Sequence, residues 1–268
     1  MSNGMTNAVD RAVLLQQKTE AVQEYVMHHL RDSPILSILG LKIPLPPFLS
    51  SHGVMAVLAA IILAMLFLLL YDKKSPVPRG WTNVLEMFVL LIRDHIAIPF
   101  LGKEDGRRMT PLFCTLFFYI LTMNLLGLIP CFQAATGDVS VTAALALVVF
   151  GVMVLGAGIR HGPVGFFKGF IPHGVPWPVL LLLVPIEIVG LGIKAFALSI
   201  RLFANMFAGH VVIFFLLGLV VIFGAGGLPF VVLGLFVYIM EIGVAFLQAY
   251  IFTLLSAIFI GQRYHPDH

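Results

Sequence analysis

The sequence has few charged residues for its length. Only 11% of its 268 residues are Asp, Glu, Lys or Arg, and 60% are hydrophobic, which gives a mean hydropathy of +1.03. Soluble domains carry about 25% charged residues. We therefore expect a polytopic membrane protein, whose organisation is described by counting membrane spans rather than soluble domains.

Cysteine is almost absent, and no pattern of metal ligands is present. Cys114 and Cys131 are 17 residues apart in one apolar segment, roughly 25 Å along a helix, which is too far for a disulfide. The adjacent His28 and His29 would point to different faces of a helix, so a metal pair is disfavoured. We expect no metal and no cofactor. The sequence also lacks a basic run interleaved with aromatic residues, which argues against binding to nucleic acid.

The apolar runs predict an all-α polytopic fold with about five membrane-embedded helices and one interfacial amphipathic helix. No cleavable signal peptide is expected, because the N-terminal stretch is polar. The predicted segments are a polar and amphipathic lead at 1–52, a first span at 53–71, an interfacial helix at 81–101, a charged loop at 103–108, a second span at 109–131, a third span at 139–159, a loop at 160–177 and a two-helix hairpin at 178–262.

Lysine and arginine are distributed unevenly among the connections, and this predicts the orientation. Seven of them lie between the first two spans, none lies between the second and third, and Arg160 and Lys168 follow the third. Cytoplasmic loops carry the excess of positive charge. We therefore expect the N-terminus and 132–138 outside, and 72–108, 160–177 and the C-terminus in the cytoplasm.

The last third of the chain is too long for ordinary spans. Residues 178–223 are 46 residues of nearly unbroken apolar sequence, roughly 69 Å as a helix, whereas the hydrocarbon core is about 30 Å thick. Residues 228–262 would form a second helix, after a glycine-rich turn at 224–227. The prediction is a strongly tilted hairpin, which suits helices that wrap a curved partner inside the membrane.

Polar side chains recur along this hairpin. Glu187, Lys194 and Arg201 are each seven residues apart and share one helix face. Four more polar residues complete the set: Asn205 one turn beyond Arg201, His210 further along, and Glu241 and Gln248 on the second helix. An antiparallel hairpin would bring His210 opposite Glu241 and would let Gln248 approach Arg201.

Two interpretations of these residues stay open: internal pairs that hold the helices together, or the lining of an ion path. Internal pairing is a serious alternative for Glu187 and Lys194, but not for Arg201, which has no acidic residue one or two turns away. Histidine and glutamate can exchange protons, whereas arginine does not deprotonate in proteins. Arg201 would therefore act as a fixed barrier, and a partner would supply the membrane-embedded acid that passes it.

Several motifs resemble a known family. The stretch RLFANMFAGH at 201–210 closely resembles the signature of subunit a of bacterial F-type ATP synthase. The stretches TMNLLGLIP at 122–130, DVSVT at 138–142, and Glu241 followed by LQAYIF at 247–252 resemble it as well. The resemblance extends from about His28 to the C-terminus.

The resemblance implies a proton-translocating stator subunit with two offset half-channels beside a rotating ring of c subunits. The further partners would be the b-subunit peripheral stalk, other ATP synthase subunits and the lipid bilayer. The subunit would have no catalytic site of its own, and it would lie in the bacterial inner membrane.

The resemblance also implies roles for single residues. Arg201 matches the essential arginine that faces the ring carboxylate, and His210 and Glu241 match a coupled pair in the outer half-channel, in the order found in some members. Asn205 and Gln248 match polar residues close to the arginine. Glu187 and Lys194 match polar positions of the same helix. Gly127 stands where some members carry an acid, so no channel role is assigned to it.

Two other classes of protein compete with this interpretation. A stand-alone ion-coupled secondary transporter could use the same polar stripe, but such proteins often contain repeats, and no second copy of the 187–210 pattern is present. An intramembrane enzyme would need a nucleophile with a base or a metal set. His161 and His173 lie in the predicted loop, and Ser199 has no base one turn away.

Overall fold

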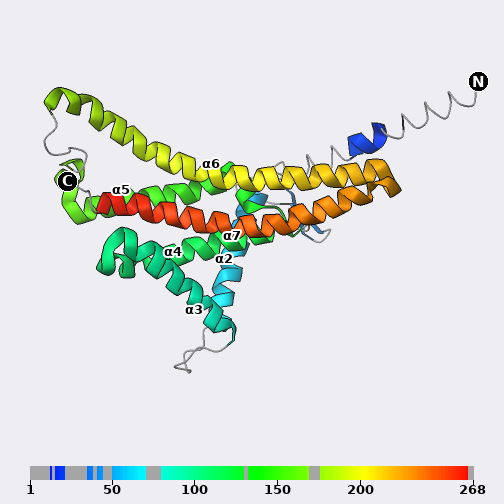
Figure 1. Cartoon of the computed structure of the whole chain (residues 1–268), viewed down its shortest axis with the longest axis horizontal. Helices are drawn as coiled ribbons and strands as arrows, with labels where there is room; N and C mark the ends of the chain where they lie inside the picture. Colours follow the sequence, from blue (N-terminus) through cyan, green and yellow to red (C-terminus); the bar gives the residue numbers. More distant parts are fainter. Residues whose placement is uncertain are drawn as a thin grey trace, which may run out of the picture.

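A computed structural model gives the arrangement of the chain (Figure 1). The structure describes residues 13, 16–21, 35–38, 41–44, 50–70, 80–129, 132–168 and 176–264. Most of the predicted lead at 1–52, including His28 and His29, lies outside the described residues, as does His173. Within the lead, residues 16–21 are helical.

The described part of the chain is almost entirely helical, which confirms the all-α prediction. Its elements are β1 (Ile35–Ile38), β2 (Leu41–Pro44), α2 (Ser51–Leu70), α3 (Trp81–Ile92), the π-helical η1 (Arg93–Ala97), α4 (Ile98–Leu128), the 3₁₀-helical η2 (Ala135–Gly137), α5 (Val139–Lys168), α6 (Trp177–Phe223), the 3₁₀-helical η3 (Gly224–Gly227) and α7 (Leu228–Tyr264). Five helical runs among the described residues are long and apolar enough to cross a membrane. The short antiparallel pair β1–β2 was not anticipated.

The prediction of a charged loop at 103–108 is wrong. Helix continues from α3 through η1 into α4, and the only non-helical backbone inside α4 is at Gly102 (φ 79°, ψ 172°). The charged residues after it are helical, and Arg108 donates to Glu104 one turn away at 3.2 Å. The charged residues argue against a position deep in the membrane, but they do not argue against a helical conformation. Lys, Glu and Arg are good helix formers, and ion pairs one turn apart stabilise a helix.

The third span also extends beyond its predicted end at 159. α5 continues to Lys168, with one non-helical residue at Gly162 (φ 72°, ψ 167°). Arg160 at this end of α5 forms an ion pair with Asp105 of α4. Residues 103–108 and 160–168, which were expected to be loops, therefore lie in helices, and this ion pair joins the two helices.

The long hairpin is confirmed. α6 is one helix of 47 residues and α7 is one helix of 37 residues, and η3 connects them at the predicted glycine-rich turn. Gly224 has φ 56°, a left-handed conformation that glycine adopts without strain. At 1.5 Å per residue α6 is about 70 Å long. It must therefore lie steeply tilted if both of its ends stay within a bilayer.

α4, α5, α6 and α7 run side by side along the length of the molecule, and α2 crosses them steeply (Figure 1). α7 contacts both α4 and α6, and α5 contacts α6. The centre of the bundle is filled by large buried side chains such as Phe113, Phe117, Phe252 and Met55. The outer surfaces of α6 and α7 remain apolar and exposed, for example at Phe196 and Phe236. These surfaces are available to lipid or to another subunit.

Close packing between α7 and the start of α4 generates a stability prediction. A Cβ atom at Gly261 would collide with the backbone carbonyl oxygen of Phe100, whereas a Cβ atom at Gly243, on the same helix, would meet nothing. Overpacking costs about 1–3 kcal/mol, and Gly-to-Ala in an open helical position gains up to about 1 kcal/mol. Gly261→Ala should therefore lower the free energy of unfolding, and Gly243→Ala should not.

Thermal unfolding of the purified chain in detergent measures this difference. Equal stability of the two variants would show that α7 does not pack this closely against the segment at Phe100.

Candidate functional site

One group of polar contacts joins α6 and α7 near the start of α6. Arg263 Nη2 donates to Glu187 Oε1 at 3.0 Å, and Lys194 Nζ donates to Gln262 Oε1 at 2.8 Å. The Lys194 ammonium also lies 5.4 Å from the centre of the Phe259 ring. Glu187 and Lys194 therefore have partners within the chain, as the internal-pair interpretation requires.

A second polar pair lies toward the turn of the hairpin. His210 Nδ1 is 3.7 Å from Glu241 Oε1, which makes an ion pair when the ring is protonated. The Glu241 residue is only 6% exposed. A Cβ atom at Gly209 would overlap with the Glu241 carboxylate. The carboxylate can thus lie against α6 only because residue 209 has no side chain.

Both nitrogens of the His210 ring lie near carbonyl oxygens. Nδ1 is 2.8 Å from the oxygen of Met206, and Nε2 is 2.9 Å from the oxygen of Gly127. A carbonyl oxygen only accepts hydrogen bonds, so both contacts are satisfied when both nitrogens carry hydrogen. Among the described residues, neither carboxylate oxygen of Glu241 has a hydrogen-bond partner. The pair can hold a proton on the imidazole, and among the described residues its buried carboxylate oxygens still have the capacity to accept hydrogen bonds.

Arg201 lies between these two groups. Its side chain is exposed on α6, and within the described part of the chain no hydrogen bond or ion pair is found for it. It follows Lys194 by seven residues and precedes His210 by nine, roughly 10 and 14 Å along the axis. Nine residues are two and a half turns, so His210 projects from the opposite side of α6. The structure therefore places between the two polar groups a cation that has no partner in the described part of the chain.

The residues around Arg201 on the surface of α6 have small side chains or are partly buried. Ala197, Ala204 and Ala208 are exposed beside it, and Asn205 is half-buried one turn further on. Small residues on a helix surface allow another helix to approach closely. The structure thus leaves room at Arg201 for a partner.

Gln248 was predicted to approach Arg201, but among the described residues no hydrogen bond joins these two side chains. Gln248 is 6% exposed, and its Nε2 is buried with no partner among the described atoms. Near it, Asn124 Nδ2 donates to the carbonyl of Ala245 at 3.3 Å, and Thr136 Oγ1 donates to Asn124 Oδ1 at 2.8 Å. These bonds fix α7 against α4 and η2, one turn from Glu241.

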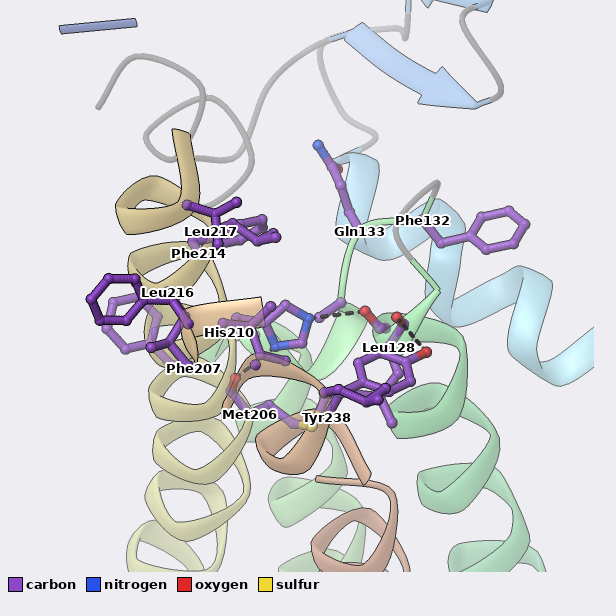
Figure 2. Close-up of a pocket in the computed structure, with 18 of the residues that line it drawn as sticks. Leu128, Phe132, Gln133, Met206, Phe207, His210, Phe214, Leu216, Leu217 and Tyr238 are labelled. Atoms are coloured by element: carbon purple, nitrogen blue, oxygen red, sulfur yellow. Dashed lines mark hydrogen bonds between the residues drawn. The ribbon is translucent and has the colours of Figure 1, made fainter. Parts of the chain in front are cut away.

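A cavity of about 360 Å³ lies at the turn end of the hairpin, and His210 projects into it (Figure 2). Its walls are mainly apolar, and its other polar side chains are His52, Gln133 and Tyr238. The Tyr238 hydroxyl donates to the carbonyl of Leu128 at 3.2 Å. The Oε1 atom of Gln133 is buried without a partner among the described atoms. The lining that contains His210 therefore also contains one polar atom, Gln133 Oε1, with no partner among the described residues.

Sequence reasoning missed three of the cavity residues. His52, Gln133 and Tyr238 come from three separate segments, so no spacing connects them. The only signal was an isolated histidine at the start of the first apolar run. Within the described ranges, no cluster of three or more potential metal ligands is found.

Comparison with known proteins gives a family match over most of the chain. Residues 53–261 match the model of the family described as ATP synthase A chain. The protein named ATP synthase subunit a of Myxococcus xanthus (strain DK1622) is 45% identical over 237 residues, covering 82% of this chain and 76% of that protein. The proteins of that name from Anaeromyxobacter dehalogenans (strain 2CP-C) and Chloroherpeton thalassium (strain ATCC 35110 / GB-78) are 44% and 41% identical. They cover 81% and 94% of this chain, which spans 59% and 79% of their respective lengths.

The contact between Glu187 and Arg263 generates a prediction about the hairpin. If it holds the ends of α6 and α7 together, Glu187→Gln and Arg263→Gln should show a coupling energy of about 0.5–3 kcal/mol in a double-mutant cycle of unfolding. The exposed pair of Glu104 and Arg108 is the control, with a coupling of about 0.3–0.5 kcal/mol expected. A coupling no larger than that of the control would exclude a structural role for the Glu187–Arg263 contact.

Proposed function

This chain belongs to the ATP synthase A chain family, and we propose that it forms two offset half-channels against a rotating ring of c subunits. Proton flow through these half-channels would drive rotation and ATP synthesis. The observation that carries the proposal is the exposed Arg201, which has no partner among the described residues and lies between two separate polar groups of one hairpin. This arrangement suits a stator subunit, because the missing counter-charge can come from another chain.

Arg201 has the chemistry of a barrier. A charge at the centre of a bilayer costs at least about 2.5–3.5 kcal/mol, and this cost is offset when a carboxylate of the ring faces the guanidinium. Arginine stays protonated, so it does not pass protons from one side to the other. It favours the ionised form of each ring carboxylate that moves past it. A carboxylate must therefore release its proton to one half-channel and regain it from the other.

The cavity and the His210–Glu241 pair would form the outer half-channel. Protons enter through the cavity, which His210 lines. They pass to Glu241, whose Oε1 atom is 3.7 Å from Nδ1 of the His210 imidazole. The buried carboxylate oxygens have no hydrogen-bond partner among the described residues, so they are free to accept bonds from water. Water and Glu241 then deliver the proton to a ring carboxylate.

The opposite end of the hairpin would form the inner half-channel. Glu187 is partly exposed, with 41% of its side chain accessible, although it is bonded to Arg263. Lys194 is half-buried beside Gln262. These residues would line the exit while their partners hold α6 against α7. Asn205 and the unpartnered Nε2 atom of Gln248 would orient water or a ring carboxylate beside Arg201.

The partners follow from the exposed surfaces and from the family. The apolar outer faces of α6 and α7 would contact the c ring and lipid, and the family assembles with other ATP synthase subunits, which we take to include the b-subunit peripheral stalk. The positive charge between the first two spans supports an orientation with the N-terminus outside and the C-terminus in the cytoplasm of a bacterial inner membrane. This subunit would contain no catalytic site of its own.

Substitution of Arg201 tests the barrier. In the assembled complex, Arg201→Ala should abolish ATP-driven proton pumping and ATP synthesis, because nothing then forces the ring carboxylate to ionise between the half-channels. Arg201→Lys keeps the positive charge but not the fixed protonation, so coupling should be lost in large part. Arg108→Ala, which removes an exposed cation of α4, is the control. Pumping at the normal rate in Arg201→Ala would contradict the proposal.

Exchange of His210 and Glu241 tests the outer pair. His210→Glu and Glu241→His should each lower proton flux, because each puts two groups of the same kind side by side. The double exchange restores one imidazole and one carboxylate and should recover part of the flux. Proton uptake by vesicles that contain the assembled complex measures this. A double variant that conducts no better than the single variants would show that the two groups are not directly coupled.

A further inference from the structure

His52 is a buried histidine in the cavity that the half-buried His210 also lines, and the proposed function of the hairpin assigns it no role. It lies in the first turn of α2 and is 4% exposed. Its ring lines the same cavity as that of His210. Its Nδ1 atom is 3.0 Å from the backbone carbonyl oxygen of Ala134. α2 thus contributes a titratable group to a cavity formed largely by α6, α7 and the 127–137 segment.

The contact with Ala134 fixes the state of the ring. The carbonyl oxygen can only accept a hydrogen bond, so Nδ1 carries the hydrogen. In the neutral ring, Nε2 then has a free lone pair, and among the described residues no hydrogen bond to Nε2 is found. His52 therefore presents a proton-accepting nitrogen. When Nε2 takes up a proton, the bond from Nδ1 to Ala134 stays intact.

The two histidines of the cavity are held by neighbouring segments of backbone. His52 bonds to Ala134, and His210 bonds to Gly127. A Cβ atom at Gly127 would lie only 2.8 Å from the Cβ atom of Ala134, so the two segments touch because residue 127 is glycine. The two imidazole rings are thus each held by a backbone carbonyl of adjoining segments, and both line one cavity. His52 can accept a proton, whereas the bonds of His210 suit the doubly protonated ring.

Among the described residues, few other groups near the cavity can compete for this proton. Tyr238 lines the cavity, and its hydroxyl is bonded to Leu128. Asp138 follows the loop, and its Oδ1 atom accepts the backbone N–H of Ser140 at 2.8 Å. The Glu241 carboxylate is 3.7 Å from His210 Nδ1 and is not part of the cavity lining. Within the described part of α2, His52 is the only titratable or charged residue.

We propose that His52 is a proton-exchange residue at the entrance of the outer path, which takes up protons from cavity water and passes them toward His210 and Glu241. A hydronium ion in the cavity gives its proton to Nε2 and becomes water. The imidazolium then returns one proton from Nε2 to a second water molecule nearer His210, and the neutral ring is restored. This inference rests on the proposed function of the hairpin.

The alternative is that His52 only tethers α2 to the loop at Ala134, and two variants separate these roles. His52→Asn keeps an amide N–H that can donate to the Ala134 carbonyl, but it cannot titrate. His52→Ala removes both functions and leaves space that free imidazole can occupy. His161→Asn is the matched control, because His161 also places a ring nitrogen, Nε2, 3.1 Å from a backbone carbonyl, that of Tyr264. Glu241→Gln tests the path itself.

The measurement is passive proton conduction by vesicles with the assembled complex, as a function of pH and normalised to the amount of complex. A positioned proton-transfer group contributes about 10²–10⁴-fold, and bypass by water recovers part of this, so His52→Asn should conduct roughly tenfold less than the wild type. His161→Asn should conduct normally. Imidazole added on the cavity side should raise conduction by His52→Ala and should not affect the wild type.

Normal conduction and an unchanged pH profile in His52→Asn, with conduction lost in Glu241→Gln, would overturn the role of His52 and leave the proposed function standing. Normal conduction in Glu241→Gln would overturn the outer path and the inference with it. If His52→Asn does not assemble, His52→Ala decides the question, and failure of imidazole to raise its conduction would count against the proposal.

Discussion

The structure depends on one electrostatic constraint, a guanidinium on an apolar helix surface with no partner in the described part of its own chain. Arg201 cannot lose its charge, and lipid alone would not solvate it well. The other polar groups of the hairpin lie to either side of it, with Glu187 and Lys194 toward one end and His210 and Glu241 toward the other. We propose that a hairpin arranged in this way is one half of an interface. Another subunit would complete its chemistry by bringing a carboxylate to the exposed face of α6.

Glycine makes the outer part of this arrangement possible at two contacts. Gly209 lets the carboxylate of Glu241 lie against α6, and Gly127 lets the end of α4 touch the following loop at Ala134. The carbonyl of Gly127 then bonds to His210, and the carbonyl of Ala134 bonds to His52. Asn124 ties the same region to α7. The side chains of His52, His210 and Glu241 are therefore positioned by close contacts of the backbone and by backbone carbonyls rather than by a network of side chains.

Much of the fold could be predicted from the sequence, because bilayer thickness converts hydrophobic length into spans. The hairpin followed from the length of its two apolar runs and from the glycines between them. The segment at 103–108 could not be predicted in this way, because its charges locate it outside the hydrocarbon core but say nothing against helix. Among the site residues, the seven-residue spacing found Glu187, Lys194 and Arg201 on one face. It could not find His52 or the carbonyl of Gly127, because these come from distant segments and carbonyls have no sequence signature.

The most direct test of the central claim is the aqueous accessibility of the two ends of the hairpin in the assembled complex. Single cysteines would be placed around His210 and around Glu187 and Lys194, in a background without Cys114 and Cys131, and treated with a membrane-impermeant thiol reagent from each side in turn. The account predicts that positions around His210 react only from the outer side and positions around Glu187 and Lys194 only from the inner side, with the division at Arg201. Reaction of both groups from the same side would contradict it, because a single continuous path would then pass the arginine.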